Sequence, residues 1–407
     1  MRMGKDFDIL IIGAGVIGLA TGNALLDLDS RLRICISEKE PQVGLHASTR
    51  NSGVLHAGFY YQSESLKARF CVEGNLMMKN FVKNNQLKIS NLGKVVIAKN
   101  EDEFDRLTQL FNRGINNGSK LQLLPASHLN AIEPLAISKF PFLWSPGTSI
   151  VDPTEVMRAL QECFLNRKGT LLFNTKAELE LENGSIRVVG DKIKARYVIN
   201  LAGNHSLSIA KSVGVGEEFD LLPVLGAYKE TKFENLPART LIYPVPHPVN
   251  PFLGVHLTPT LRGTVKIGPT AFPVLGPEQY NFNSKIRLQE LFKSTKSFLN
   301  FARNQKSATR EILRTEIPYL KLSNTLRDLS QMIPTARSSA GWKSLKPGIR
   351  AQLIENSSGK FVNDFIIREI ANSMHVLNIV SPGFTSALSF GRHIAIKALE
   401  ARNDGNY

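Results

Sequence analysis

The sequence predicts an α/β protein with two domains, one built on a parallel sheet that binds a nucleotide and one, of α+β type, on an antiparallel or mixed sheet. Three observations support this prediction. A strand pattern, a glycine-rich turn and a helix pattern follow one another at the N-terminus, later strands alternate with helices, and residues 221–274 carry strand patterns separated by prolines. Alternation of strands and helices is typical of parallel sheets, whereas consecutive strands with short turns are typical of antiparallel ones.

The N-terminal pattern predicts a dinucleotide-binding βαβ unit. Residues 9–12 suit a strand buried on both faces, and apolar residues recur at helical spacing from residue 16 onwards. Glycines at this junction permit a tight turn, the approach of a pyrophosphate and close helix packing. They are Gly13, Gly15 and Gly18. A second strand over 32–37 is expected to bring Glu38 to a ribose hydroxyl. NAD and FAD both contain this ribose, so both cofactors fit the pattern. The alternative is that the glycine-rich turn has only a packing role.

Further strands and helices alternate along the chain. A helix over 64–84 has Ser63 as its predicted cap, and an Asp-Pro pair opens a helix over 152–167. A final helix is predicted to start after 381–385 and to end near residue 400. Strands are predicted at 93–99, 170–174, 177–181, 185–189, 194–201, 361–369 and 374–380.

The changes in pattern predict how the two domains share the chain. We expect a discontinuous nucleotide-binding domain over 1–90, 150–220 and 345–402. A substrate domain is expected over 91–149 and 221–344. The length of 407 residues is sufficient for two domains.

The composition excludes several classes of protein. Three cysteines without a C-x-x-C spacing predict neither a disulfide framework nor a zinc site, and they favour a reducing compartment. The apolar stretch 9–26 imitates a signal peptide, but the acids before it and its glycines favour the nucleotide-binding interpretation. We therefore predict a cytoplasmic protein that holds no metal.

The net charge of +15 is unevenly distributed, because residues 285–350 hold fourteen Lys and Arg against four acids. Apolar residues between these charges could form helices with one basic side, as in proteins that rest on an anionic membrane surface. The segment therefore allows a peripheral contact with the cytoplasmic face of a membrane, and the alternative is a solvated basic surface. Nucleic acid binding is not predicted, because no recognised reader motif accompanies the charge.

A polar loop over 44–61 follows the nucleotide-binding unit. Residues Asn51–Gly53 can donate hydrogen bonds to the edge of a heterocycle, and His56, Tyr60 and Tyr61 can move protons or stack on a ring. A histidine in such a loop is either a functional group or a structural one that is satisfied by its neighbours. The position of the loop favours the functional interpretation.

Two further groups suggest a substrate site. Tyr243, His256 and Thr270 lie on three predicted strands with apolar surroundings, and Arg350 follows a Pro-Gly turn. A guanidinium group is the natural partner of a carboxylate, although a surface ion pair is the alternative. No Ser-His-Asp pattern, P-loop or metal-ligand spacing is present, which argues against hydrolases, kinases and metalloenzymes.

At these residues the sequence resembles the FAD-dependent oxidoreductases of the D-amino-acid oxidase superfamily, and within it the L-2-hydroxyglutarate dehydrogenase/oxidase family. The resemblance extends over nearly the whole chain, with several long motifs in one order. These motifs are RNSGVLHAGFYY at 50–61, IYPVPHPVNPFLGVHLTP at 242–259, GTVKIGPTA at 263–271, GIRAQ at 348–352, VNDFII at 362–367 and SPGFTSAL at 381–388.

The resemblance implies a Rossmann-like, FAD-binding domain of the D-amino-acid oxidase type, with the C-terminal segment returning to the flavin. It also decides for FAD over NAD. The residues expected to bind FAD are Gly13, Gly15, Val16, Ile17, Gly18, Glu38, Lys39, Ser48, Thr49, Arg50, Asn51, Ser52, Gly53, Ala177, Ala202, Gly203, Pro382, Gly383, Phe384, Thr385 and Ser386.

The same resemblance implies oxidation of an L-2-hydroxy acid, with the electrons passed to a quinone or to oxygen. The base that takes the hydroxyl proton is expected to be His256 or His56, and His56 could instead tether the flavin covalently. Tyr243 is expected to orient the substrate and Arg350 to hold its α-carboxylate. Further substrate contacts are expected from Tyr60, Tyr61 and Thr270.

The chain departs from the family pattern at two places. Leu225–Tyr228 stands where the family usually has Arg-Gly-Glu-Tyr, and Thr270 stands where it usually has Asn. These changes leave open whether the second carboxylate of 2-hydroxyglutarate is bound. One alternative substrate is an amino acid or glycerol 3-phosphate, for which Lys266 would suit the phosphate. A second alternative is a flavin-binding interaction protein that has lost catalysis.

Overall fold

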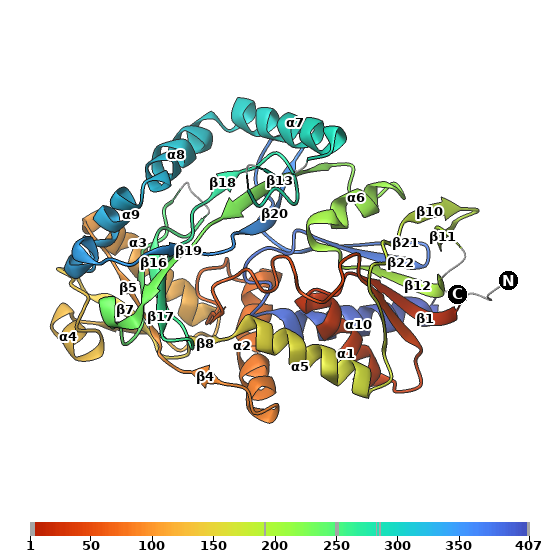
Figure 1. Ribbon diagram of the computed structural model, residues 1–407, viewed down its shortest axis with the longest axis horizontal. Coiled ribbons are helices and arrows are strands. Elements are labelled where there is room, and N and C mark those ends of the chain that lie inside the picture. Colours follow the sequence, from red (N-terminus) through yellow and green to blue (C-terminus); the bar gives the residue numbers. More distant parts are fainter. Residues whose placement is uncertain (1–4, 191–192, 249–251, 282, 285, 405–407) are drawn as a thin grey trace.

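The predicted α/β architecture is confirmed by a computed structural model, which describes residues 5–190, 193–248, 252–281, 283–284 and 286–404. Two sheet-containing halves lie side by side, and both termini are at the outer end of the same half (Figure 1). No helix among the described residues is long and apolar enough to cross a membrane.

The half that holds the termini is built on a six-stranded sheet. All neighbouring strands run parallel except the edge strand β21, which is antiparallel to β22. The strand order is β21 (Ile366–Ile370), β22 (Ser373–Leu377), β12 (Ile193–Asn200), β1 (Lys5–Ile12), β2 (Ile34–Ser37) and β9 (Thr170–Leu172).

Both faces of this sheet are covered, as the apolar run at residues 9–12 requires. Ile9 and Ile11 pack into a core with helices α1, α5, α10 and α2, whereas Leu10 and Ile12 pack into a second core with α6 and a hairpin of β10 and β11. These elements are α1 (Val16–Leu28), α2 (Leu66–Asn84), α5 (Pro153–Asn166), α6 (Ser206–Lys211), α10 (Ala387–Asp404), β10 (Leu179–Glu182) and β11 (Ser185–Val188).

The other half is built on an eight-stranded sheet that joins two distant parts of the sequence. β15 pairs in parallel with β5, although 146 residues separate Leu241 from its register partner Lys94. The order is β19 (Lys343–Ser344), β14 (Lys229–Lys232), β17 (Thr264–Gly268), β16 (His256–Pro259), β15 (Leu241–Pro244), β5 (Lys94–Ile97), β7 (Phe142–Ser145) and β6 (Gln122–Leu124). Helices α3 (Glu101–Asn116) and α4 (Leu129–Ile132) belong to this half.

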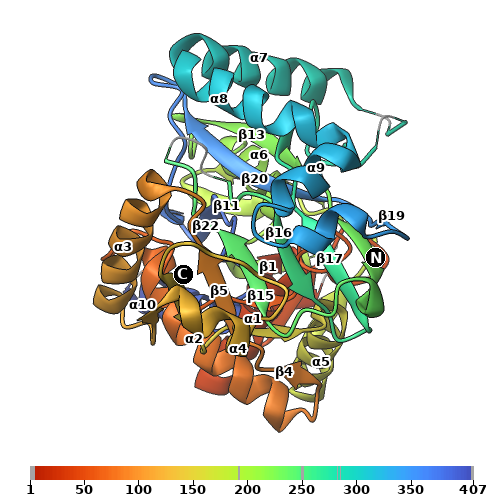
Figure 2. The ribbon, with the colours of Figure 1, turned by 90° about the vertical axis from the view of Figure 1, so that its left-hand side faces the viewer.

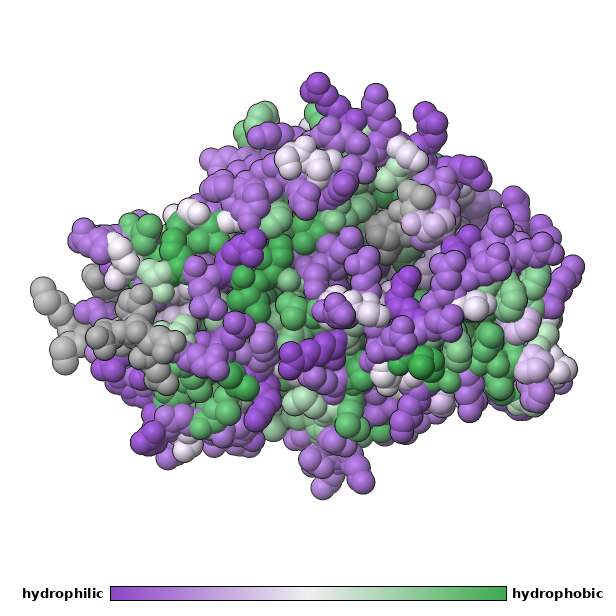
Figure 3. Space-filling view, turned by 180° about the vertical axis from the view of Figure 1, so that it is seen from behind, coloured by the Kyte–Doolittle hydropathy of each residue, from purple (hydrophilic) through white to green (hydrophobic). Residues whose placement is uncertain are grey.

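Two three-stranded sheets and an arch of helices complete the fold. Helices α7, α8 and α9 pass over the top of the molecule, with α7 and α8 beside each other in both ribbon views (Figures 1 and 2). From behind, apolar side chains form a band beneath a largely hydrophilic upper rim (Figure 3). The elements are α7 (Leu288–Asn304), α8 (Lys306–Glu316), α9 (Leu322–Leu329), the sheet β18 (Phe272–Pro273), β13 (Phe219–Gly226), β20 (Gly348–Glu355), the sheet β3 (Val54–Leu55), β8 (Ser149–Val151), β4 (Ile89–Ser90), and 3-10 turns at 126–128, 203–205, 233–235, 317–320 and 334–338.

Two local predictions were wrong. The cap of α2 is Ser65, whose hydroxyl accepts from the Ala68 N–H, and not Ser63. Glu64 has a φ of +69°, which is incompatible with a helix that starts there. The strand expected over 361–369 begins only at Ile366, because the carbonyls of Val362 and Asp364 accept from the Asn378 side chain and not from a neighbouring strand.

Candidate active site

A cavity of about 1980 Å³ lies at the carboxyl ends of the parallel strands and extends to the eight-stranded sheet. Ile12, Ser37 and Leu201, at or just beyond the ends of β1, β2 and β12, line its first part. Ligands of open parallel sheets bind at this edge, and a single small ligand occupies roughly 300–1,000 Å³. The cavity therefore has room for a dinucleotide together with a small substrate.

The nucleotide end is built around the first turn of α1. Gly13 has a φ of +105°, and a Cβ on Gly18 would lie 2.0 Å from the Gly13 carbonyl oxygen, so the helix can close on its strand only with glycine there. The Val16 N–H donates to the Ser48 hydroxyl at 2.9 Å, which brings the 44–61 loop onto the helix N-terminus. Partly unsatisfied N–H groups at this end suit a phosphate.

Glu38 lies at the end of β2, beside this helix. Its carboxylate accepts from the Ala14 N–H at 2.8 Å and from the Glu40 N–H at 3.0 Å. A carboxylate has about four acceptor positions, so it can still accept from a ribose hydroxyl. The backbone contacts hold the carboxylate at the edge of the cavity.

A cluster of polar and charged side chains lines the nucleotide end, and it was not predicted from the sequence. The Glu278 carboxylate accepts from Lys39 Nζ at 2.6 Å and from His205 Nε2 at 2.7 Å. His205, and then Lys39, hold the pKa of Glu278 well below its usual range. Lys39 also pairs with Glu40. Glu278 belongs to the loop before α7, so the cluster joins that loop to the nucleotide-binding half.

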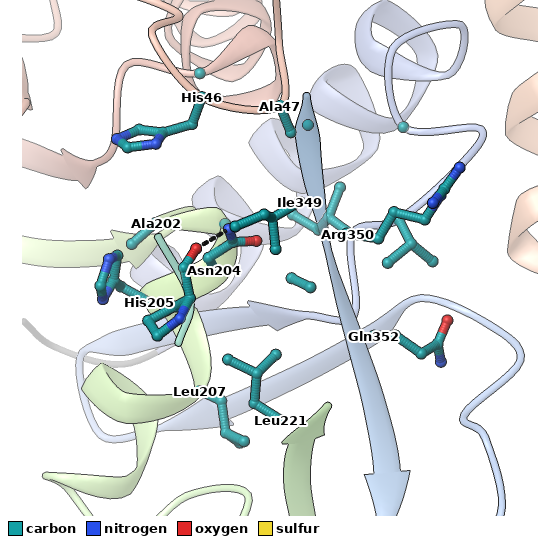
Figure 4. A pocket seen from close by; sticks show the side chains of 18 of the residues that line it. His46, Ala47, Ala202, Asn204, His205, Leu207, Leu221, Ile349, Arg350 and Gln352 are labelled. Carbon is teal, nitrogen blue, oxygen red and sulfur yellow. Dashed lines mark hydrogen bonds between the residues drawn. The ribbon is translucent and has the colours of Figure 1, made fainter. Parts of the chain in front are cut away.

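Two neighbouring contacts strengthen this connection. The Asn204 side chain donates to the Pro277 carbonyl at 2.7 Å, and Nδ1 of His46 lies 2.6 Å from the Tyr280 hydroxyl. His46, Asn204 and His205 lie on one side of the pocket in the close view, and Arg350 lies on the other (Figure 4). The cavity therefore has one end lined by charged groups and a separate end that holds Arg350.

His56 and the C-terminal segment meet at this second end. The backbone N–H of His56 donates to the Thr385 hydroxyl at 3.1 Å, and that hydroxyl donates to the Val54 carbonyl at 3.2 Å. Gly74 of α2 makes the close approach possible, because a Cβ there would lie 2.4 Å from the Thr385 carbonyl oxygen. The structure thus brings residue 385 to the 44–61 loop.

His256 lines the same end of the cavity from β16. Its Nδ1 lies 2.8 Å from the Gly254 carbonyl oxygen, and its ring stacks on Tyr243 with 3.8 Å between the centroids. Burial lowers the pKa of His256 to about 3, with smaller contributions from the charges of Lys94 and Arg350. The imidazole is therefore neutral at physiological pH and has one nitrogen free to accept a proton.

Lys94 lies behind His56 and was missed by sequence reasoning. The lysine is fully buried, and its Nζ lies 3.4 Å from Nδ1 of His56 and 4.1 Å from the centre of the Tyr243 ring. Burial lowers the pKa of Lys94 to about 7. The one feature of the sequence that could have identified Lys94 is the presence of a lysine at the start of an apolar strand pattern.

Arg350 lies on β20 and points into the cavity. Its Nη1 donates to the Thr270 carbonyl at 3.4 Å, and its guanidinium lies 5.5 Å from the centre of the Phe252 ring. A Cβ on Gly226 would lie 2.8 Å from Nη1, so glycine leaves the space for this side chain. Tyr228 also lines this end of the cavity, and like Lys94 it was not predicted as a site residue. A guanidinium in such a site stays charged and suits a carboxylate.

Most of the residues expected to contact cofactor or substrate line the cavity. They are Gly13, Gly15, Val16, Ile17, Glu38, Lys39, Ser48, Arg50, Asn51, Ser52, His56, Tyr60, Tyr61, Ala177, Ala202, Gly203, Tyr243, His256, Arg350, Pro382, Gly383, Phe384 and Thr385. Other expected residues are not part of its lining: Gly18, Thr49, Gly53, Thr270 and Ser386. Instead, the hydroxyl of Thr49 donates to the Gly44 carbonyl, and that of Thr270 accepts from the Ala227 N–H.

Nearly the whole chain is similar to FAD-dependent oxidoreductases. The model of a family described as DAO, FAD dependent oxidoreductase, matches residues 8–396. An L-2-hydroxyglutarate dehydrogenase of Salmonella houtenae is 33% identical over 405 residues, covering 97% of this chain and 94% of the relative. A mitochondrial L-2-hydroxyglutarate dehydrogenase of Caenorhabditis briggsae is 32% identical, with 97% and 93% covered.

The fold also has solved counterparts. The structure of L-alpha-glycerophosphate oxidase from Mycoplasma pneumoniae, with FAD bound, superimposes with a TM-score of 0.73 at 22% identity, covering 97% of this chain and 95% of that one. At this level of identity the likeness concerns the fold.

Proposed function

The chain belongs to the DAO family of FAD dependent oxidoreductases, and from this premise we propose that it oxidises L-2-hydroxyglutarate to 2-oxoglutarate at the His256 end of the cavity. The predicted cofactor, FAD, is confirmed by this membership. One observation carries the proposal. A single cavity begins at the N-terminus of α1 and ends at a neutral histidine that faces the same space as a half-buried arginine.

The residues present fit FAD. The first turn of α1 offers N–H groups to a pyrophosphate, and the Glu38 carboxylate lies where a ribose hydroxyl would donate. A Cβ on Gly15 would lie 3.2 Å from the Ser48 hydroxyl, so the glycine keeps this surface open. Bound flavin would accept the hydride that leaves the substrate carbon.

This chain's own residues would bind the acid and take its proton. Arg350 holds the α-carboxylate, which places the hydroxyl-bearing carbon near the two histidines. One histidine takes the hydroxyl proton as the C–H bond breaks, because a hydroxyl is too weak an acid to ionise unaided. Burial keeps both His56 and His256 neutral, so each has one unprotonated ring nitrogen that can accept a hydrogen bond from the hydroxyl.

The departures from the family pattern do not argue against this substrate. Leu225 and Ala227, which stand where the family usually has Arg and Glu, are not part of the cavity lining. The backbone of Leu225 pairs with Phe272 and Ile349 inside a sheet. These positions favour a structural role for the lost charge pair.

The alternatives find less support. Lys266, considered for a phosphorylated substrate, does not line the cavity. A flavin-binding protein without catalysis would have His256 and Arg350 outside the pocket, whereas both lie on its wall.

Reduction of the bound flavin without oxygen tests the proposal. L-2-hydroxyglutarate should bleach the flavin absorbance, whereas its D-enantiomer, lactate, amino acids and glycerol 3-phosphate should react far more slowly. Failure of every hydroxy acid to bleach the flavin would refute it, and faster bleaching by an amino acid or glycerol 3-phosphate would support the alternatives instead.

We also propose that the electrons leave to oxygen or to a quinone, and that α7 brings the protein to an anionic membrane surface. Leu288, Phe292 and Leu299 are 83%, 73% and 60% exposed, and they share one side of α7 with Lys296 and Arg303. Apolar side chains between cations are typical of helices that bind anionic lipid.

Binding to lipid vesicles tests the membrane contact. The protein should sediment with vesicles that contain anionic lipid at low salt and be released at high salt, because screening weakens the attraction. Phe292→Ser should weaken binding, whereas Leu76→Ser, a matched change at an exposed leucine of α2, should not. Equal recovery in the supernatant under all conditions would contradict the contact.

A further inference from the structure

Lys94 is a buried lysine whose pKa lies near neutrality, and no carboxylate of the described residues pairs with it. It opens β5 with no exposed surface, and its amine is surrounded by His56 and by the rings of Phe59, Tyr60 and Tyr243. No ion pair of Lys94 occurs among the described residues. A charged group without a partner is costly to bury, so such a lysine needs a compensating role.

Its contact with His56 determines which ring nitrogen of that histidine carries the proton. In its ammonium form Lys94 has three N–H donors and no acceptor, so Nδ1 of His56, 3.4 Å away, then accepts from Lys94 Nζ. A neutral imidazole donates from one nitrogen and accepts at the other. His56 therefore carries its proton on Nε2, the nitrogen on the side away from Lys94.

His256 has the opposite arrangement. A carbonyl oxygen only accepts, so Nδ1 of His256 must carry the proton that is donated to Gly254 at 2.8 Å. Nε2 of this neutral ring is then unprotonated. Both histidines line the cavity, and they lie close enough for His256 to act electrostatically on His56, so one can offer a donor and the other an acceptor.

We propose that Lys94 is a positioning residue that holds His56 as the hydrogen-bond donor to the substrate, which leaves His256 as the base. This inference rests on the proposed function and deepens it. In the reaction, the substrate O–H proton would pass to Nε2 of His256, the hydrogen of the C–H bond would leave with the bonding electron pair as a hydride that bound flavin would accept, and the C=O bond would form. Nε2–H of His56 donates throughout to an oxygen of the acid.

The tautomers can be measured directly in the FAD-loaded enzyme. Labelling the histidines with 15N and recording long-range 15N–1H correlations distinguishes the Nδ1–H from the Nε2–H form; spectra of His56→Gln and His256→Gln assign the signals. We expect Nε2–H at His56 and Nδ1–H at His256. Nδ1–H at His56 in the unmodified enzyme would overturn the proposal, whether or not any substrate reduces the flavin.

Variants of Lys94 provide the second readout. Lys94→Met should shift His56 to a mixture of tautomers and slow flavin reduction by about tenfold or more, as expected for loss of one buried hydrogen bond. Lys94→Gln keeps an N–H donor and should restore the Nε2–H form and part of the rate. His256 should keep its tautomer in both variants.

Lys79→Met is the matched control, because Lys79 is a partly buried lysine that donates to the Gly147 carbonyl and does not touch His56. It should change neither tautomer nor rate. An unchanged Nε2–H signal at His56 in Lys94→Met would show that Lys94 does not set the tautomer and would overturn the proposal. Slow flavin reduction with unchanged tautomers would have the same meaning.

Discussion

The rings of Tyr243 and His256 stack, with their centroids 3.8 Å apart and their planes inclined by 17°. The two residues come from the neighbouring antiparallel strands β15 and β16, and both are buried. The Gly254 carbonyl accepts from Nδ1 of the same imidazole. The ring of His256 is therefore held by two contacts, and Nε2 is left for the substrate.

Replacement of His256 should remove the base. In His256→Asn, anaerobic flavin reduction by L-2-hydroxyglutarate should slow by roughly 10²–10⁴-fold, the usual contribution of a general base. FAD content should stay unchanged, and Tyr243→Phe, which keeps the stacked ring, should lose much less. A His256→Asn enzyme with an ordinary reduction rate would show that the base is another group.

Arg350 should determine substrate affinity. Arg350→Met should raise KM for the hydroxy acid by about 10–100-fold, because a hydrogen bond to a charged group contributes about 1.5–3 kcal/mol. Arg262→Met, which breaks the ion pair with Asp152, is the control. A kcat loss without any change in KM would contradict a carboxylate-binding role.

The space beside Arg350 should tolerate no added methyl group. Gly226→Ala would place a Cβ 2.8 Å from Nη1 of Arg350 and should displace the guanidinium. We expect a raised KM with FAD still bound. Gly147→Ala has its nearest neighbour, the Ala57 Cβ, at 4.0 Å and should leave the kinetics unchanged. Equal kinetics of both variants would mean that the side chain of Arg350 can move aside without cost.

Glu278 should slow the release of FAD, because it joins the loop before α7 to Lys39 and His205. Glu278→Gln should release FAD about tenfold faster in a dilution assay followed by flavin fluorescence; partial exposure limits the effect. Glu73→Gln, which loses a surface pair with Arg69, is the control. Identical release rates would show that the loop does not retain the cofactor.

His375 should make the fold sensitive to acid. Burial lowers its pKa to about 4, so below pH 6.5 the unfolded chain binds a proton that the folded one does not. The contribution of His375 to the unfolding free energy is complete above pH 6.5. It is lost as the pH falls towards 4, and the loss is at most about 3 kcal/mol. His375→Gln should flatten the dependence of the unfolding free energy on pH, as measured in urea; the exposed His128→Gln should not.

The N-terminal nucleotide-binding unit could be predicted from the sequence because its signals are local. The change from strand to helix periodicity at Gly13 depends only on neighbouring residues, and the motifs around His56, His256 and Arg350 are contiguous. Local patterns failed where a distant group competes for the backbone. The Asn378 side chain binds the carbonyls of Val362 and Asp364, so the strand expected from residue 361 begins later.

The chemistry of the site was decided by tertiary structure. In the sequence, Lys94 is only the first residue of an apolar strand pattern. It contacts His56 because the fold brings together residues that are 38 positions apart. Glu278 meets His205 across 73 positions. Protonation depends on burial and on the nearest charge or carbonyl, and neither exists until distant strands align. The sequence therefore determined the nucleotide-binding unit and the candidate side chains, whereas the packing of distant segments determined which atoms hold the protons.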